Sequence, residues 1–224
     1  MRSMEYFRAC AYAVRLMAGA VKIPHQDESL IKTRRRQIFL AACRVLARKS
    51  FHQATVKEIA LEAGIAAGSV YLYLRSKDEI LLLLADSMVG ELVEGLPEIR
   101  ADSAGDPRRE LLGIMRRVLD IIDRYREAFA VLNHEVRYLA RRQRYKASLQ
   151  TILEPYLSSL GSVLKRGREM ALMQVEDVAS VVEAVHMLCS GWSTGTGLLE
   201  KTDKETYWRE ISNIIQGRFF IDAA

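Results

Sequence analysis

Residues 55–82 read TVKEIALEAGIAAGSVYLYLRSKDEILL. Thr55 is followed three residues later by Glu58, a capping-box pattern that marks the start of a helix. Gly64 stands where a left-handed turn would end that helix, and only a few residues separate it from a second predicted helix over residues 67–74. Two short helices joined by a glycine-containing turn predict a helix-turn-helix.

Longer predicted helices flank this motif on both sides. Upstream, apolar residues recur with the helical period from Thr33 onward. Downstream, a helix is predicted over residues 77–96, in which Ser76 and Glu79 form a second capping box. Pro97 is expected to end that helix, because proline lacks the backbone N–H that a helix interior needs.

Amphipathic patterns continue through the rest of the chain. Further helices are predicted over residues 106–123, 127–139, 145–164, 176–199 and 202–220. Pro155 lies inside one of them and is expected to kink it. Nine helices after residue 31 and no convincing strand predict an all-α fold, with an N-terminal three-helix head that contains the helix-turn-helix and a six-helix body.

Composition excludes several classes of protein. The chain has 224 residues, of which 50% are hydrophobic and 27% charged, with only 4 prolines. These values exclude a disordered chain, a collagen-like repeat and a disulfide scaffold. No apolar run reaches the roughly 18 residues of a membrane span. The three cysteines, Cys10, Cys43 and Cys189, lie far apart, which argues against a disulfide framework or a structural zinc site and favours a reducing compartment.

Charge is unevenly distributed along the chain. Residues 31–80 hold ten Lys and Arg against four Asp and Glu, whereas residues 81–224 hold 19 basic and 21 acidic side chains. A basic N-terminal module on a nearly neutral body predicts a polyanion-binding head and a body with a different task.

The expected organisation has three parts. Residues 31–78 form the helix-turn-helix DNA-binding domain, and residues 79–224 form a ligand-binding and dimerisation domain. Residues 1–30 are interpreted as a tail, an extra helix or the product of a mis-assigned start, with Met4 or Met17 as other starts. This segment faintly resembles a signal peptide, but Arg15 interrupts its apolar stretch, so a cytoplasmic location is expected.

The helix-turn-helix stretch resembles the DNA-binding head of the tetracycline repressor (TetR) family. The Thr55 start, the I-A-x-x-A-G turn, the G-S-V-Y-x-Y recognition helix and the S-K-D-E-I-L start of the next helix occur together at the family's spacing. Leu74 stands where phenylalanine is commoner, an apolar exchange in the small core. The resemblance implies a ligand-responsive transcriptional regulator, a repressor that binds a palindromic operator as a homodimer and is released by a small apolar effector.

A short recognition helix can enter the major groove and place its first side chains at base edges. The residues predicted to reach base edges are Ala66, Ala67, Gly68, Ser69, Tyr71 and Leu72. Those predicted to contact phosphates are Thr55, Tyr73 and Lys77. Arg34, Arg35 and Arg36 would follow the DNA backbone or an adjacent minor groove, unless they are a solvated helix start. One of the two tyrosines, Tyr71 or Tyr73, would instead pack inside the head.

By the same resemblance, the body dimerises through its last two helices, residues 176–220. Gly191, Gly195 and Gly197 would allow close helix approach, and Trp192, Trp208 and Ile211 would add apolar contacts. The alternative is that these glycines only loosen a helix end in a monomer.

The body is also expected to bind the effector. The candidate lining residues, which would equally suit an ordinary core, are Met88, Leu92, Met115, Leu119, Tyr125, Phe129, Leu132, Arg137, Arg141, Leu153 and Tyr156. The segment HEVRYLARRQRYK also contributes Arg142, Arg144 and Lys146. It faintly resembles the family's fatty acyl-CoA-responsive subgroup, because arginine forks suit the CoA phosphates. A solvated basic face is the alternative.

Two other classes of function are weighed against the regulator. An E-x-x-H pair, Glu183 and His186, occurs once, whereas a di-iron bundle needs two such pairs and two further glutamates. No phosphate-binding loop, G-x-S-x-G or H-E-x-x-H occurs, so no catalytic residue, metal or cofactor is expected and the chain is not predicted to be an enzyme. The other alternative is a helical-bundle interaction or membrane-surface protein, with residues 1–21 as an amphipathic anchor.

Overall fold

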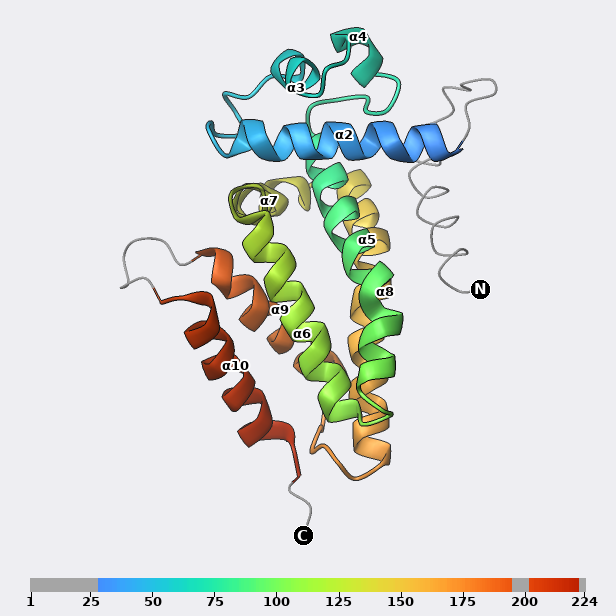
Figure 1. Cartoon of the computed structure of the whole chain (residues 1–224), viewed down its shortest axis with the longest axis vertical. Helices are drawn as coiled ribbons and strands as arrows, with labels where there is room; N and C mark the ends of the chain where they lie inside the picture. Colours follow the sequence, from blue (N-terminus) through green and yellow to red (C-terminus); the bar gives the residue numbers. More distant parts are fainter. Residues whose placement is uncertain (1–27, 195–201, 222–224) are drawn as a thin grey trace. The chain divides into compact units, whose positions relative to one another are not determined.

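The computed structural model describes residues 28–194 and 202–221. Nine α-helices and no strand occur in this part of the chain, which confirms the predicted all-α fold (Figure 1). The helices are α2 (Glu28–Leu46), α3 (Val56–Glu62), α4 (Ala67–Val70), α5 (Glu79–Asp102), α6 (Pro107–Arg124), α7 (Arg126–Leu139), α8 (Gln143–Glu169), α9 (Val178–Thr194) and α10 (Lys204–Phe219). Within the described ranges, no helix combines the length and apolar character required to cross a membrane.

The chain divides into two compact units. The first unit holds the described residues up to Val89 together with Glu127–Leu153, and the second holds Gly90–Arg126 together with the described residues from Glu154 onward. The first unit therefore contains the predicted head and also α7 and the start of α8, so its limits differ from the predicted division at residue 78. Of the predicted segment 1–30, only residues 28–30 are described, and they begin α2.

The first unit is built on α2, with α3 and α4 on one side of that helix (Figure 1). Its apolar face is fully buried, with Ile38 and Phe39 at the centre. Ile59 of α3, Val70 of α4 and Leu74 are buried too. Removing this much apolar surface from water stabilises the head by about 1.5–3 kcal/mol for each large side chain.

Three predicted helix limits need correction. Helix α2 begins at Glu28, five residues before the predicted start. Regular helix in α4 ends at Val70, and residues 71–73 continue as turns. Helix α5 begins at Glu79 and runs through Pro97 to Asp102.

The physical reason at Pro97 is its exposure. Proline removes one backbone hydrogen bond from the helix, but the Pro97 ring itself is exposed and displaces no core side chain. Buried Leu92 lies five residues before the proline and keeps that stretch of the helix packed. The tertiary packing of α5 therefore overrides the local stop signal.

The second unit is organised around the amphipathic helix α6. Its buried residues include Leu111, Ile114, Met115, Leu119 and Ile122. Asp106 caps its start by accepting a hydrogen bond from the Arg108 backbone N–H at 2.8 Å, and Pro107 occupies its first turn. The other main helices of this unit, α9 and α10, pack against α6 and against each other.

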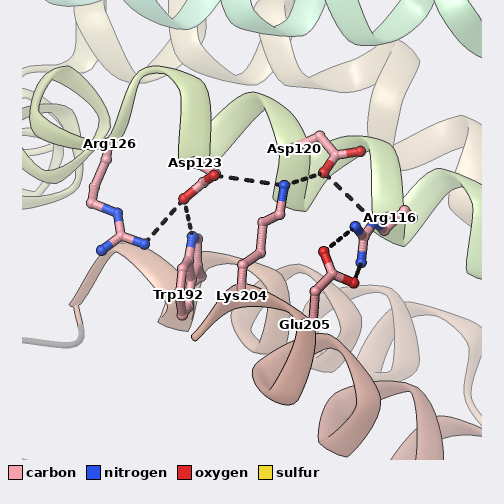
Figure 2. Close-up of polar contacts among 7 residues, drawn as sticks. All are labelled: Arg116, Asp120, Asp123, Arg126, Trp192, Lys204 and Glu205. Carbon is pink, nitrogen blue, oxygen red and sulfur yellow. Dashed lines mark hydrogen bonds and ion pairs between the residues drawn. The ribbon is translucent and has the colours of Figure 1, made fainter. Parts of the chain in front are cut away.

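Polar side chains tie α9 and α10 to α6 (Figure 2). The carboxylate of Asp123 accepts hydrogen bonds from Trp192 at 3.0 Å and from Arg126 at 3.1 Å. Lys204 donates to Asp120 at 2.9 Å, and both Nη atoms of Arg116 reach the carboxylate of Glu205. Partial burial raises the pKa of Asp123, but the hydrogen bonds from Trp192 and Arg126 outweigh it, so the net pKa is lowered. Asp123 is therefore ionised at neutral pH.

Candidate nucleic-acid interface

The helix-turn-helix begins with the capping box that the sequence predicts. Thr55 Oγ1 accepts from the Glu58 backbone N–H at 3.2 Å, and the Glu58 carboxylate accepts from the Thr55 N–H at 3.0 Å. The turn after α3 closes by two backbone bonds, from Gly64 N to Leu61 O at 3.1 Å and from Ile65 N to Ala60 O at 3.0 Å. This arrangement requires a left-handed residue, and Gly64 has φ +68°.

The predicted base-reading residues form an exposed surface on and beside α4. Tyr71 and Leu72 expose 52% and 46% of their area, large values for apolar side chains. Ala66 and Gly68 are exposed, while Ala67, Ser69 and Tyr73 are half-buried. Of the two tyrosines, Tyr71 is therefore the one that is free of core packing. Exposed apolar side chains beside small residues suit contact with thymine methyl groups and base edges.

Gly68 has no internal role that the structure reveals. A Cβ atom built there meets no other atom within 4 Å, and its φ is not in the left-handed region. Alanine would therefore fit the isolated protein as well as glycine does. A glycine at this exposed point of α4 would allow the backbone to approach a partner closely, and its predicted contact with DNA stays a prediction.

Two of the three predicted phosphate contacts, Lys77 and Thr55, already have partners within the first unit. Lys77 Nζ donates to the His52 carbonyl at 2.9 Å and lies 4.8 Å from the centroid of the Phe51 ring. These contacts attach the segment that precedes α5 to the loop that follows α2. The Thr55 hydroxyl lies within hydrogen-bond distance of the Glu58 carboxylate. To contact a phosphate, either side chain would have to bind the phosphate and its partner within the chain at the same time. Both phosphate contacts stay predictions.

The three consecutive arginines differ from one another. Arg35 is mostly buried and pairs with Asp86 of α5 at 3.1 Å, so it contributes to the interior of the first unit. Arg34 donates to Gln37 at 2.9 Å, and exposed Arg36 lies over the Phe39 ring at 4.9 Å. Arg34 and Arg36 remain the better candidates for the DNA backbone.

Ion pairs hold the last turn of α2 and the residues just after it to α3. Glu62 pairs with Arg44 and Arg48, each at 2.6 Å, and Glu58 pairs with Lys49. A hydrogen bond from Lys49 lowers the pKa of Glu58, and hydrogen bonds from Arg48 and Arg44 lower the pKa of Glu62, both below their ordinary 4.5. The sequence shows these charges but does not show that they pair across two helices.

These pairs predict acid sensitivity of the head. Because the folded pKa values lie below the unfolded ones, the pairs contribute stability above pH ~4.5, and this contribution is lost as the pH falls through the folded values. We expect the melting temperature, measured by circular dichroism, to fall as the pH is lowered from about 5 to about 3. Glu62→Gln should flatten this fall. Glu176→Gln, at an exposed position with no ion pair among the described residues, should not. An unchanged acid profile in Glu62→Gln would contradict the assignment.

The arginine cluster at the start of α8 contacts the start of α5 inside the first unit. Arg142 pairs with Asp78 at 3.0 Å and Arg144 pairs with Glu79 at 3.1 Å. Glu79 also accepts from the Arg75 backbone N–H at 2.8 Å, which replaces the capping box predicted with Ser76. The segment that connects α4 to α5 is therefore held by the two arginines.

The candidate effector-lining residues divide between the two units. Met88 and Leu132 are buried in the first unit, Phe129 and Leu153 are half-buried there, and Arg137 and Arg141 are exposed. The members in the second unit, all buried, are Leu92, Met115, Leu119, Tyr125 and Tyr156. The Tyr125 hydroxyl donates to Glu91 at 3.0 Å. Their role in ligand binding stays a prediction.

The residues expected at a dimer interface pack largely within the chain. Trp192 is buried, and its ring centroid lies 5.3 Å from that of Tyr207. Ile211 is buried as well, and a Cβ at Gly191 would lie only 2.6 Å from the Tyr207 hydroxyl, so this glycine does allow close approach of α9 and α10. Gly195 and Gly197 lie outside the described residues.

Other side chains on α9 and α10 are apolar and exposed. Met187 of α9 exposes 59% of its area and Ile214 of α10 exposes 53%. The sequence pattern did not single them out, because periodicity assigns apolar residues to a core without distinguishing a chain's own core from an interface. No group of three or more potential metal ligands occurs in the described ranges of the chain.

Known proteins resemble this chain in both sequence and fold. The family model described as "Bacterial regulatory proteins, tetR family" matches residues 38–84. The fatty acid metabolism regulator protein of Bacillus subtilis is 30% identical over 131 residues, which cover 58% of this chain and 66% of that protein. The repressor KstR2 of Rhodococcus jostii is 28% identical over 156 residues, 68% of this chain and 76% of that protein.

Structural similarity extends over most of the chain. The crystal structure of the regulator FadR from Bacillus subtilis in complex with stearoyl-CoA has a TM-score of 0.66 and 23% identity, covering 81% of this chain and 98% of that one. At this identity, the likeness shows the fold. The sequence matches span 66% of the Bacillus fatty acid regulator and only 27% and 48% of two further regulators.

Proposed function

We propose that this chain, which belongs to the tetracycline repressor (TetR) family of bacterial regulatory proteins, is a ligand-responsive transcriptional repressor that binds a palindromic operator as a homodimer. The observation that carries the proposal is the exposed surface of α4, where Ala66, Gly68, Tyr71 and Leu72 face outward over a turn held by the Thr55 capping box and Gly64. The related proteins are regulators rather than enzymes.

The dimer follows from the small size of this surface. One short recognition helix reads few base pairs, and two copies related by a two-fold axis read both halves of a palindrome. Met187 and Ile214 are the apolar side chains that favour α9 and α10 as the contact between subunits.

The test is operator binding by fluorescence anisotropy on DNA from upstream of the chain's own gene, at one stated salt concentration. We expect binding much tighter than to a shuffled duplex of equal length, with one dimer per site. Equal affinity for both duplexes would contradict a sequence-specific role at this operator.

We further propose that the effector is a fatty acyl-CoA. Arg142 and Arg144 are about half exposed in their ion pairs, so the phosphates of CoA can compete with Asp78 and Glu79 for the two guanidinium groups. Loss of these pairs would free the start of α5, which follows directly on the helix-turn-helix. A coupling free energy of about 3 kcal/mol would weaken operator binding over a hundredfold.

Removing these guanidinium groups should uncouple the effector from DNA. Arg142→Ala with Arg144→Ala is expected to weaken stearoyl-CoA binding at least about tenfold, since a hydrogen bond to a charged group contributes about 1.5–3 kcal/mol. Isothermal titration calorimetry measures the affinity, and Lys165→Ala, which removes an exposed cation elsewhere on α8, is the control. Unchanged affinity in the double variant would exclude these arginines as the CoA site.

A further inference from the structure

Four buried polar atoms lie on α8 and α9 in the second unit, two on each helix. They are the Tyr156 hydroxyl, Ser159 Oγ, His186 Nδ1 and Ser190 Oγ, and none has a hydrogen-bond partner among the described residues. Tyr156 is only 3% exposed and Ser190 only 4%. A buried polar group without a partner destabilises a protein, so four in one place call for a physical explanation. We refer to these four residues as the α8–α9 polar seam.

The geometry brings the four groups to one side of each helix. The ring centroids of Tyr156 and His186 are 5.8 Å apart, with the rings tilted by 59°. Ser159 lies one turn from Tyr156 on α8, and Ser190 lies one turn from His186 on α9. The helices approach closely at Gly161, where a Cβ atom would lie 3.8 Å from Val178. The seam is therefore a short row of hydrogen-bonding groups between two packed helices.

The groups that face this row are uncharged at neutral pH. Burial raises the pKa of Tyr156 well above its ordinary range, and the nearby Cys189 thiol adds to this rise. Burial lowers the pKa of His186, against the opposing effect of Glu183, which is exposed one turn away. Burial also raises the pKa of Cys189 to about 12, so its thiol is neutral.

The surroundings set the chemistry of what such a row can bind. Leu160 and Val185, next to the seam on each helix, are buried. A carboxylate or phosphate brought here would need a cation to offset the loss of its hydration, and the seam's own groups carry none. Hydroxyl groups and a neutral imidazole instead match an uncharged oxygen, because they can both donate and accept.

We propose that the α8–α9 polar seam binds an uncharged oxygen, a hydroxyl or a carbonyl, carried on the hydrocarbon body of the effector. The inference rests on the proposed function only in taking this ligand to be the effector. The Tyr156 hydroxyl donates to the ligand oxygen and His186 Nδ1 accepts from a ligand hydroxyl, since these two rings lie together. Ser159 and Ser190, each one turn further along its helix, extend the row of hydrogen-bonding groups. The seam therefore selects oxygenated chains or rings over plain hydrocarbon.

The test compares matched probes on the full chain. Calorimetry compares the binding of stearoyl-CoA with that of 3-hydroxystearoyl-CoA. Thermal shift compares decane with 2-decanol and 2-decanone, which carry the oxygen without a CoA group. Together the two series separate the contribution of the oxygen to binding from that of the CoA group. At least one oxygenated probe is expected to bind about tenfold more tightly than its plain counterpart, the effect of one or two neutral hydrogen bonds. Tyr156→Phe and Ser190→Ala should each reduce this preference.

Matched controls exist on the same helices. Ser158 Oγ donates to Glu154 at 2.6 Å and Ser193 Oγ donates to the Ser190 carbonyl at 2.9 Å, so both hydroxyls are satisfied. Ser158→Ala and Ser193→Ala should leave the preference for the oxygenated probe unchanged.

Stability gives a readout that does not depend on the probe. Without ligand, Tyr156→Phe and Ser190→Ala should melt at or above the wild-type temperature, because each removes an unpartnered hydroxyl. Lower melting temperatures in both variants would show that these hydroxyls are already satisfied within the protein, and would overturn the inference. Equal binding of plain and oxygenated probes would overturn it as well. Failure of stearoyl-CoA to release DNA would count against the proposed effector alone, since the decanol arm tests the seam independently.

Discussion

Gly68→Ala is expected to stabilise the protein while weakening operator binding by more than about a hundredfold. Alanine is favoured over glycine in a helix by up to about 1 kcal/mol, and the added methyl group meets no atom of the chain within 4 Å. On DNA, the same methyl would hold the backbone of α4 away from the groove. A loss of about 1.5 kcal/mol at each of two half-sites gives about 3 kcal/mol for the dimer.

The measurements are a melting curve and operator anisotropy on the same preparation. Gly90→Ala is the matched control, because Gly90 also lies in a helix where an added Cβ meets nothing within 4 Å, but outside the helix-turn-helix. It should raise the melting temperature without changing DNA affinity. If Gly68→Ala bound the operator as tightly as wild type, the backbone of α4 would not approach DNA closely, and the placement of the recognition surface would be wrong.

Met187→Glu combined with Ile214→Glu is expected to convert the dimer to monomers and to reduce operator affinity by about a thousandfold or more. Each side chain occurs twice in a two-fold interface, so four apolar groups are lost and four carboxylates would have to be desolvated. Burial of one such side chain contributes about 1.5–3 kcal/mol. The monomer retains the α9–α10 packing, because the Tyr207 hydroxyl still donates to the Leu188 carbonyl at 2.6 Å.

Sedimentation equilibrium measures the association, and circular dichroism shows whether the monomer stays folded. Met170→Glu is the control, since Met170 exposes a similar area in the turn after α8. A double variant that remains dimeric would place the subunit contact elsewhere on the chain.

Several features follow from the sequence because they depend on neighbouring residues alone. The Thr55–Glu58 capping box spans three residues, and the left-handed turn at Gly64 needs only the absence of a Cβ atom. The helical period of residues 107–124 predicted α6 almost to the residue. Such local signals also carry the family resemblance, because the spacing of the helix-turn-helix is itself local.

Other features depend on distant residues that compete with local preference. Pro97 carries a local stop signal, yet it lies inside α5 because the packing of that helix and exposure of the proline outweigh one lost hydrogen bond. The interface role of Trp192 stays a prediction, but the sequence does not show that Asp123 and Tyr207 contact this side chain within its own chain. In each case the packing partners are far apart in the sequence, so a pattern of neighbouring residues cannot reveal them.

The sequence by itself therefore determined the all-α class, the order of the helices and the helix-turn-helix. Only the tertiary structure decided that Arg142 and Arg144 hold Asp78 and Glu79, and that Tyr156 and His186 lie together without partners. The reason is physical: periodicity and capping act over three or four residues, whereas ion pairing and desolvation depend on which side chains the folded chain brings within a few ångströms.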